Sequence, residues 1–309
     1  MGADAGFEYH EQRRIGLTVA CHDTDTIPKV SNAGEIVTVG GRRVQVMHNG
    51  VLVEADGYYG PWMTEIIRRL RGHHEPQEEA AMHAIVPRLP PAPIVVELGS
   101  FWAYYALWAC RERPDARVVL VEPDPHNLDV GRRNADLNRV RATFLRAAVA
   151  AGDGHALPFT CESDGVARPT ERVSVDGLVA RERLPRVDLL IADVQGAELD
   201  VLSGAAGALD AGLIRFLVLS THHHSISGDP LTHQRCLDAI VARGAHIVAE
   251  HTVSESCSGD GLIACSFDAG DRDISAPVSH VRARDTLFGE VEYELAEALA
   301  QEPCRRAGA

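Results

Sequence analysis

The sequence predicts an α/β domain built on a doubly wound, Rossmann-like and mostly parallel sheet with helices on both faces. Strand-length apolar runs alternate with helix-length segments from residue 94 onward, which is typical of parallel β-α units. The first run leads into Gly99, and the next run ends at Glu122. An acid about 20 residues beyond such a glycine accepts hydrogen bonds from a ribose diol in nucleotide-binding folds. We therefore expect a nucleotide-containing ligand at this edge, with a solvated Glu122 in an ordinary β-α-β unit as the alternative.

The composition is that of an ordinary soluble globular protein. The chain has 309 residues, of which 45% are hydrophobic and 24% are charged. Its net charge of -14 makes a nucleic-acid backbone an unfavourable partner. Apolar runs stay well below the roughly 20 residues of a membrane span. The seven cysteines are scattered without a C-x-x-C pair, as in reduced proteins. We expect a cytoplasmic protein with neither a nucleic acid nor a membrane as partner.

Three parts are expected along the chain: an N-terminal extension (1–90), a core (91–270) and a helical tail (271–309). Within the extension we expect an irregular surface arm at 1–33, with a lid or dimer arm as the alternative. A β-meander at 36–55 and two helices at 61–70 and 76–89 are expected to follow. The tail is expected to contain a helix over 285–301. The meander and this helix are plausible contact surfaces, so a homo-oligomer remains open.

Seven strands are expected in the core, at 94–98, 118–122, 143–147, 187–193, 216–220, 246–250 and 262–267. Helices are expected at 101–110, 125–137, 196–202 and after Pro230, with a short extra hairpin at 156–161. A polar loop joins the last two strands, which is compatible with an antiparallel final pair.

The turn at Gly99 does not suit a pyrophosphate. A dinucleotide fingerprint needs further glycines, and none follows Gly99 within the next four residues. Glu97 would repel a phosphate but attract a cation, such as a sulfonium with its amino-acid ammonium. These residues favour S-adenosylmethionine over a nicotinamide dinucleotide.

The segment VDLLIADVQGAELDVLSGA at 187–205 resembles the FkbM family of S-adenosylmethionine-dependent methyltransferases, and SVDGL at 174–178 supports the resemblance. It covers about residues 94–220 and implies the seven-stranded sheet of class I methyltransferases. Two positions depart from the family pattern. Gln195 stands where an acid is usual, and Ala103 stands where a glycine is usual.

By this resemblance, the methionine portion of the cofactor would be held by Glu97, Gly99 and Ser100. Glu122 would bind the ribose and Ala148 would flank the adenine. Asp193 would face the methyl-transfer site.

The segment before the core carries His73, His74, Glu75 and Gln77. These residues either cap an exposed helix start or face the cofactor cleft, and Glu75 and Gln77 are included among the candidate cofactor residues. The loop at 251–261 is likewise either a contact to a sugar-like acceptor or a solvated turn.

A histidine cluster follows the fifth expected strand, at 222–224. His222 or His223 could act as a general base, because an unperturbed histidine titrates near pH 6.5. Asp193 and His222 could instead hold a divalent metal that orients the acceptor. The structural alternative is that these histidines cap the strand, pack in the core or face solvent.

Taken together, these features predict an O-methyltransferase that methylates a hydroxyl of a polar small molecule. We expect a sugar moiety of a natural product or a glycan precursor as the acceptor. A metal-dependent hydrolase or lyase that uses the histidine cluster is one alternative, and a non-catalytic nucleotide-binding protein is the other.

Overall fold

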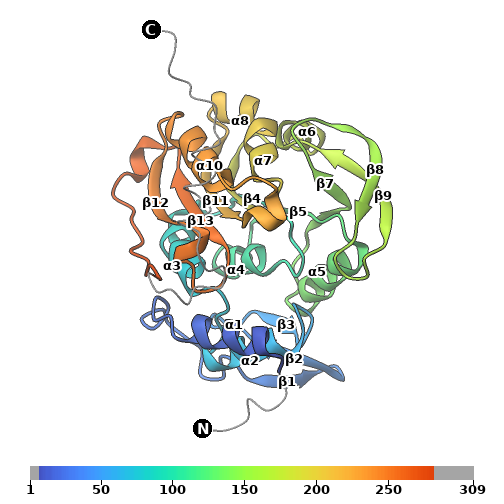
Figure 1. The fold of residues 1–309 in the computed structure, drawn as a ribbon, viewed down its shortest axis with the longest axis vertical. Coiled ribbons are helices and arrows are strands. Elements are labelled where there is room, and N and C mark those ends of the chain that lie inside the picture. The colour runs from blue at the N-terminus through green and yellow to red at the C-terminus, as the bar shows by residue number, and fades with distance from the viewer. Residues whose placement is uncertain (1–6, 282–309) are drawn as a thin grey trace.

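A seven-stranded sheet forms the centre of the molecule, which was obtained as a computed structural model describing residues 7–281 (Figure 1). The strand order is β12-β13-β11-β10-β4-β5-β6. Neighbouring strands are parallel except that β13 runs antiparallel to β11 and β12. This confirms the predicted fold. The strands are β4 (Ile94–Leu98), β5 (Arg117–Val121), β6 (Thr143–Leu145), β10 (Val187–Ala192), β11 (Ile214–Thr221), β12 (His246–His251) and β13 (Gly261–Ser266).

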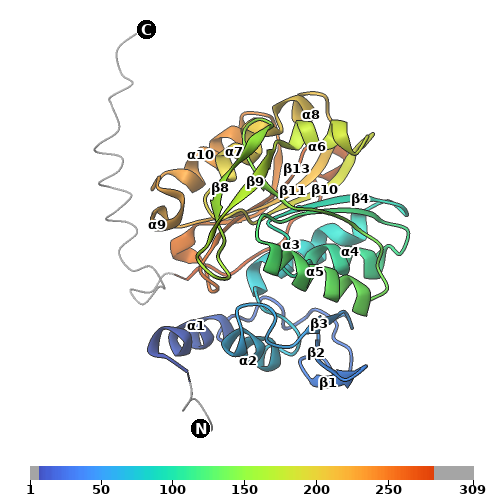
Figure 2. The same cartoon turned by 90° about the vertical axis from the view of Figure 1, so that its right-hand side faces the viewer.

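Helices cover both faces of this sheet (Figure 2). One face carries α3 (Pro76–Ile85), α4 (Tyr104–Glu112) and α5 (Pro125–Leu137). The other carries α6 (Val175–Arg181), α7 (Glu198–Gly204), α8 (Ala206–Asp210) and α10 (Thr232–Val241). Successive strand residues point to opposite faces, so Val95 joins one apolar core and Val96 joins the other. All five residues of β4 are buried, as expected for a central parallel strand.

The N-terminal extension forms a further layer against α3, α4 and α5 (Figure 2). It contains α1 (Tyr9–Val19), the meander β1 (Ile36–Val39), β2 (Arg42–Val46) and β3 (Leu52–Glu54), and α2 (Pro61–Arg69). The meander is confirmed, with antiparallel pairing of both β1 and β3 to β2.

The expected irregular arm at 1–33 is wrong over residues 9–19, because α1 is a docked helix, whereas residues 20–33 are irregular as expected. Ile15 is only 2% exposed, and Thr18 Oγ1 donates to the carbonyl of Cys257 at 3.0 Å. The Glu8 backbone N–H donates to the Glu11 carboxylate at 2.8 Å, which closes the first turn. Only a narrow stripe of α1 is buried and most of the helix is polar, so apolar residues do not recur at helical spacing in its sequence.

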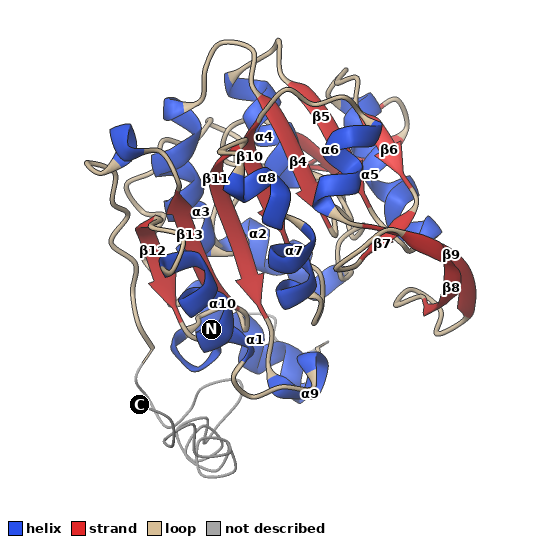
Figure 3. Cartoon of the chain, turned by 90° about the horizontal axis from the view of Figure 1, so that it is seen from above, coloured by secondary structure: helices blue, strands red, loops and turns tan. Residues whose placement is uncertain are grey.

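A small second sheet stands beside the main one, with the order β7-β9-β8 (Figure 3). The expected strand at 143–147 is divided between β6 and β7 (Ala147–Val149). The expected short hairpin is longer and consists of β8 (Gly154–Thr160) and β9 (Ala167–Val173). The short helix α9 (His224–Ser227) follows β11. No helix in the described part of the chain is long and apolar enough to cross a membrane, and the helix expected at 285–301 lies outside the described residues.

Candidate active site

A cavity of about 350 Å³ lies where β4, β5 and β10 end. This edge is where open α/β sheets place their ligands. The wall contains all but one of the candidate cofactor residues, namely Glu75, Glu97, Gly99, Ser100, Glu122, Ala148 and Asp193. Residues separated by more than 100 positions in the sequence therefore meet around a single space.

Gln77 is the exception. Its amide Nε2 donates to the carbonyls of Glu255 (3.1 Å) and Ser279 (2.5 Å), and its Oε1 accepts from the Cys257 N–H (2.7 Å). The side chain therefore fastens α3 to the segments that follow β12 and β13. The expectation that Gln77 contacts the cofactor is corrected to a structural role.

Gly99 allows the turn after β4 to pass close to the neighbouring strand. Its φ is +70°, in the region that disfavours side chains, and a Cβ would lie 1.6 Å from the backbone oxygen of Asp193. The N–H groups of Gly99 and Ser100 both donate to the carbonyl of Val121, at 2.9 and 3.0 Å. The buried Ser100 hydroxyl has no hydrogen-bond partner among residues 7–281, so it remains available to a ligand in the cavity.

Two buried acids flank this turn. Glu97 accepts a hydrogen bond from the Ala106 N–H (3.0 Å), and Glu122 accepts from the N–H groups of Phe101 (3.1 Å) and Asp124 (2.8 Å). Burial raises the pKa of each carboxyl to about 8, although these hydrogen bonds oppose the shift. Both acids are therefore poised to bind a ligand that supplies positive charge or hydroxyl donors.

Aromatic side chains that the sequence analysis missed complete the cavity. Tyr58 stacks on Trp102, with ring centroids 4.3 Å apart and an interplanar angle of 1°, and Phe101 meets Tyr58 edge-on at 5.0 Å. Phe159 reaches the same wall from β8. The sequence offered one sign of this aromatic wall, namely the Tyr58-Tyr59 pair between two glycines in a short polar turn.

A second cavity of about 170 Å³ adjoins the first and shares Asp193, Glu75 and Glu162 with it. Most residues that line only this cavity come from the N-terminal layer and from the loop before β13; they include Arg14, Trp62, Ser258 and Asp260. The loop at 251–261 thus does reach the candidate site. Asp193 lies on the wall that the two cavities share.

A charged cluster surrounds this shared wall. Asp193 follows β10, His222 follows β11, and Asp260 precedes β13. Since β13 runs antiparallel to β11, its start lies at the same edge as the ends of the other two strands. His222 Nε2 is 3.1 Å from Asp193 Oδ1 and 3.6 Å from Asp260 Oδ1, and its Nδ1 is 2.5 Å from Glu198 Oε1.

His222 lies behind these carboxylates and lines neither cavity, and its side chain is fully buried. Burial alone would lower the pKa of His222, but the surrounding carboxylates outweigh burial and raise this pKa well above its usual value. The carboxylates therefore favour the protonated imidazole. The expectation that His222 removes a proton from the acceptor is corrected, and its position suits orientation of Asp193.

His223 lies away from both cavities. It is half-buried at the start of α9, where its Nδ1 is 2.9 Å from the Ser225 hydroxyl. Adjacent residues at a strand end point in different directions, so only one of the two histidines can join the cluster. His223 is therefore placed as a helix cap and not as a base.

His74 and Glu75, just before α3, face the cleft, as the functional alternative expected, whereas His73 lines neither cavity. His74 Nε2 is 3.2 Å from Glu75 Oε2, and Tyr105 donates its hydroxyl to the same oxygen at 3.0 Å. Although burial would lower the pKa of His74, the charges and hydrogen bonds of Glu75 and Glu79 raise it to about 10. His74 thus brings a fixed positive charge to the wall of both cavities.

The two departures from the family pattern occupy comparable backbone positions. Ala103 precedes α4 with φ 62°, and Gln195 follows Asp193 with φ 48°. A positive φ favours glycine, which explains why a glycine is usual at position 103. Gln195 lines both cavities and places its Nε2 3.4 Å from Asp193 Oδ1.

Comparison with known proteins agrees with this geometry. Residues 92–244 match the model of the methyltransferase FkbM domain. No curated protein matches the sequence. Solved structures with a similar fold include precorrin-6y C5,15-methyltransferase from Geobacter metallireducens GS-15 (12% identity, TM-score 0.41, 62% of this chain and 87% of that chain). The O-methyltransferase from Bacillus cereus in complex with SAH is another (16% identity, TM-score 0.40, 62% of this chain and 80% of that chain).

The sheet order is that of the class I methyltransferase fold, and the cavity lies at its carboxyl edge. The domain match identifies the family. Residues 92–244 belong to the methyltransferase FkbM domain family.

Proposed function

We propose that the protein transfers a methyl group from S-adenosylmethionine to a hydroxyl of a polar small molecule. The observation that carries the proposal is the position of Asp193 between two adjoining cavities. The larger cavity contains the turn at Gly99 and the two acids that flank it, and it would hold the cofactor. The smaller cavity would hold the acceptor.

The cofactor would lie with its charged methionine end at Glu97 and its ribose at Glu122. A carboxylate suits an ammonium, and a second carboxylate suits a diol. The aromatic wall around Phe101 and the Ala148 surface are placed to sandwich an adenine. The Ser100 hydroxyl, buried without a partner among the described residues, supplies one further hydrogen bond.

The acceptor would lie against Tyr59 and Trp62, with its reacting hydroxyl directed at Asp193. Aromatic faces beside carboxylates suit a sugar ring, because the ring has apolar faces and a polar rim. This supports a sugar moiety of a natural product or glycan precursor as the acceptor.

In the reaction, the acceptor oxygen attacks the sulfonium methyl as the carbon–sulfur bond breaks, and S-adenosylhomocysteine leaves. The hydroxyl proton passes to the Asp193 carboxylate. The imidazolium of His222 holds this carboxylate in place through the contact at Nε2. Alignment of oxygen, carbon and sulfur is the main requirement, and the rigid strand ends provide it.

A divalent cation at this cluster is the alternative to the protonated His222, because only the neutral ring can bind a metal. The buried His222 Nε2 makes no well-aligned hydrogen bond to a described residue, and Glu198 occupies the other ring nitrogen, as acids do behind metal-bound histidines. Glu198, Asp193 and Asp260 place three carboxylates around one imidazole, which leaves excess negative charge. Asp193, His222 and Asp260 would hold the ion, and it would lower the pKa of a bound hydroxyl.

Two measurements test the proposal. Titration calorimetry should detect S-adenosylmethionine binding to the wild-type protein, and its absence would sink the proposed activity. Release of S-adenosylhomocysteine should then be followed with a panel of glycosides and polyols. With a responsive acceptor, Asp193→Asn should lower kcat by about 10²–10⁴-fold while cofactor affinity stays within about threefold of the wild-type value. An Asp193→Asn variant with full turnover would show that another group accepts the proton.

A further inference from the structure

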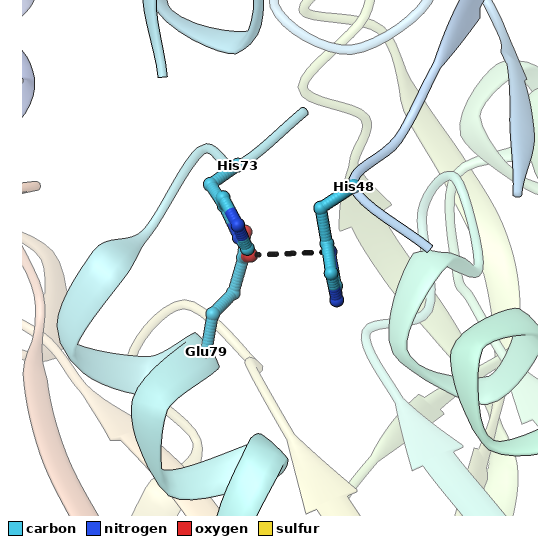
Figure 4. A group of neighbouring side chains, drawn as sticks. All are labelled: His48, His73 and Glu79. Carbon is cyan, nitrogen blue, oxygen red and sulfur yellow. Dashed lines mark hydrogen bonds and ion pairs between the residues drawn. The ribbon is translucent and has the colours of Figure 1, made fainter. Parts of the chain in front are cut away.

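A buried group of metal-binding residue types lies between the N-terminal layer and the core, apart from the cavities (Figure 4). His48 follows β2, His73 precedes α3, and Glu79 belongs to α3. Their exposed fractions are 2%, 0% and 0%. One donor atom from each lies within 4.8 Å of the other two, and no other group of three in the described part of the chain meets this limit.

The donors are held by their surroundings. The rings of His48 and His73 stack, with centroids 4.2 Å apart and an interplanar angle of 18°. His48 Nδ1 is 2.9 Å from the Tyr104 hydroxyl and 3.9 Å from Glu79 Oε2. His73 Nδ1 hydrogen-bonds to Glu79. His73 Nε2 is fully buried and has no hydrogen-bond partner among residues 7–281, which is unusual for a polar atom in a protein interior.

We propose that His48, His73 and Glu79 bind a divalent transition-metal ion, with zinc as the best match. Two imidazoles and a carboxylate are a zinc donor set, whereas magnesium and calcium prefer oxygen ligands alone. Zinc bonds of about 2.1 Å in a tetrahedron separate ligand atoms by roughly 3.4 Å. The observed 3.9 Å between His48 Nδ1 and Glu79 Oε2 is close to this spacing. His73 Nδ1 bonds Glu79 directly, so His73 would bind the ion through its unpartnered Nε2. The Tyr104 hydroxyl is placed to complete the coordination or to orient His48.

The site would act on the candidate active site through position. Glu79 would bind the proposed ion through Oε2. Its other oxygen, Oε1, accepts a hydrogen bond from the backbone N–H of His74 (2.8 Å) and lies 2.6 Å from Nδ1 of the same residue. His74 in turn contacts Glu75 on the wall of both cavities. A metal at Glu79 would fix this segment without touching cofactor or acceptor.

The test uses the full chain prepared without a histidine tag, dialysed against EDTA and then supplied with zinc or cobalt. We expect at least about one zinc per chain by elemental analysis, a higher Tm with zinc than without it, and visible absorption bands when cobalt is added. Wild-type protein that is folded but binds neither zinc nor cobalt would overturn the proposal. This measurement needs no variant, so it decides the question even if the substitutions below impair folding.

Variants locate the ion. Glu79→Gln and His73→Gln should lose the metal, whereas the exposed His126→Gln should keep it. The double variant Asp193→Asn, Asp260→Asn should also keep the metal, because it alters only the cluster at the sheet edge. Loss of all metal in this double variant, with retention in Glu79→Gln, would overturn the assignment. Binding of S-adenosylmethionine is measured separately, so failure of the proposed methyl transfer would not be confused with failure here.

Discussion

The pH dependence of cofactor binding tests whether Glu97 holds the cationic end of the methyl donor. Burial raises the pKa of this carboxyl to about 8, and the Ala106 N–H at 3.0 Å keeps it from rising further. An ammonium binds the carboxylate and not the protonated acid, so a proton on Glu97 competes with the cofactor. Affinity should therefore be greatest above the pKa and should fall as the pH drops below 8.

The size of the effect follows from this pKa. For one competing proton, the Kd increases by a factor of about 2 at pH 8 and about 33 at pH 6.5, a difference of roughly 16-fold or ~1.6 kcal/mol. Titration calorimetry with S-adenosylmethionine at these two pH values measures it. Repeating the pH 6.5 titration in buffers of different ionisation heat should show release of nearly one proton on binding.

Two variants separate Glu97 from the second buried acid. Glu97→Gln should bind weakly and lose this pH dependence. Glu122→Gln is the matched control, because the pKa of Glu122 is also raised to about 8 by burial, but hydroxyl donors can still bind a protonated carboxyl. It should keep most of the dependence. A wild-type Kd that changes by less than about threefold between the two pH values, without proton release, would refute the role given to Glu97.

Four further outcomes are expected. Gly99→Ala should abolish detectable cofactor binding in calorimetry, since its Cβ would overlap a backbone oxygen at 1.6 Å; retained affinity would contradict the geometry of the turn. His222→Gln should lower kcat by about 10-fold or more, whereas His223→Ala should stay within about twofold of wild type; a reversed order would restore His223 as the base. Trp62→Ala should raise the acceptor KM by ~10-fold and leave cofactor Kd unchanged, as measured by steady-state kinetics and calorimetry. Glu97→Gln should raise the Tm at pH 8. The folded pKa of Glu97 is about 8 and lies above the unfolded value near 4.3, so the wild-type protein loses stability as the pH rises between these values. A variant with the wild-type Tm at both pH 8 and pH 5 would argue against the raised pKa.

The cofactor half of the site was predictable because its signals are local. Glu97 and Gly99 are two positions apart, and Glu122 ends the next strand, so the β-α-β pattern alone brings them together. The acceptor half was not predictable in this way. Arg14, Trp62 and Asp260 belong to three distant segments, and only packing of the N-terminal layer against the sheet edge unites them.

The histidines show a second limit of sequence reasoning. The rule that ligands bind at strand ends correctly drew attention to residues 222–224. The rule could not tell whether His222 or His223 would face inward, because a shift of one residue along a strand turns a side chain from one face of the sheet to the other. The pattern named His73 but gave no sign that Glu79 is buried beside it, since polar residues at a helix start are usually exposed caps. Their neighbour His48 lies 25 positions before His73 in the sequence.

The contact between Gly99 and the main chain at Asp193 bears on how such an enzyme could acquire new substrates. The backbone at Gly99 packs directly against the backbone at Asp193. The distance between the turn at Gly99 and the Asp193 carboxylate is therefore set by the main chain, and exchanging side chains cannot tune it. In the proposed arrangement, acceptor choice is left to the extension around Arg14 and Trp62 and to the loop at 252–260, which line the smaller cavity. Most of that wall lies outside the matched domain at 92–244. Grafting these segments between relatives would therefore change the substrate while the transfer geometry is inherited intact.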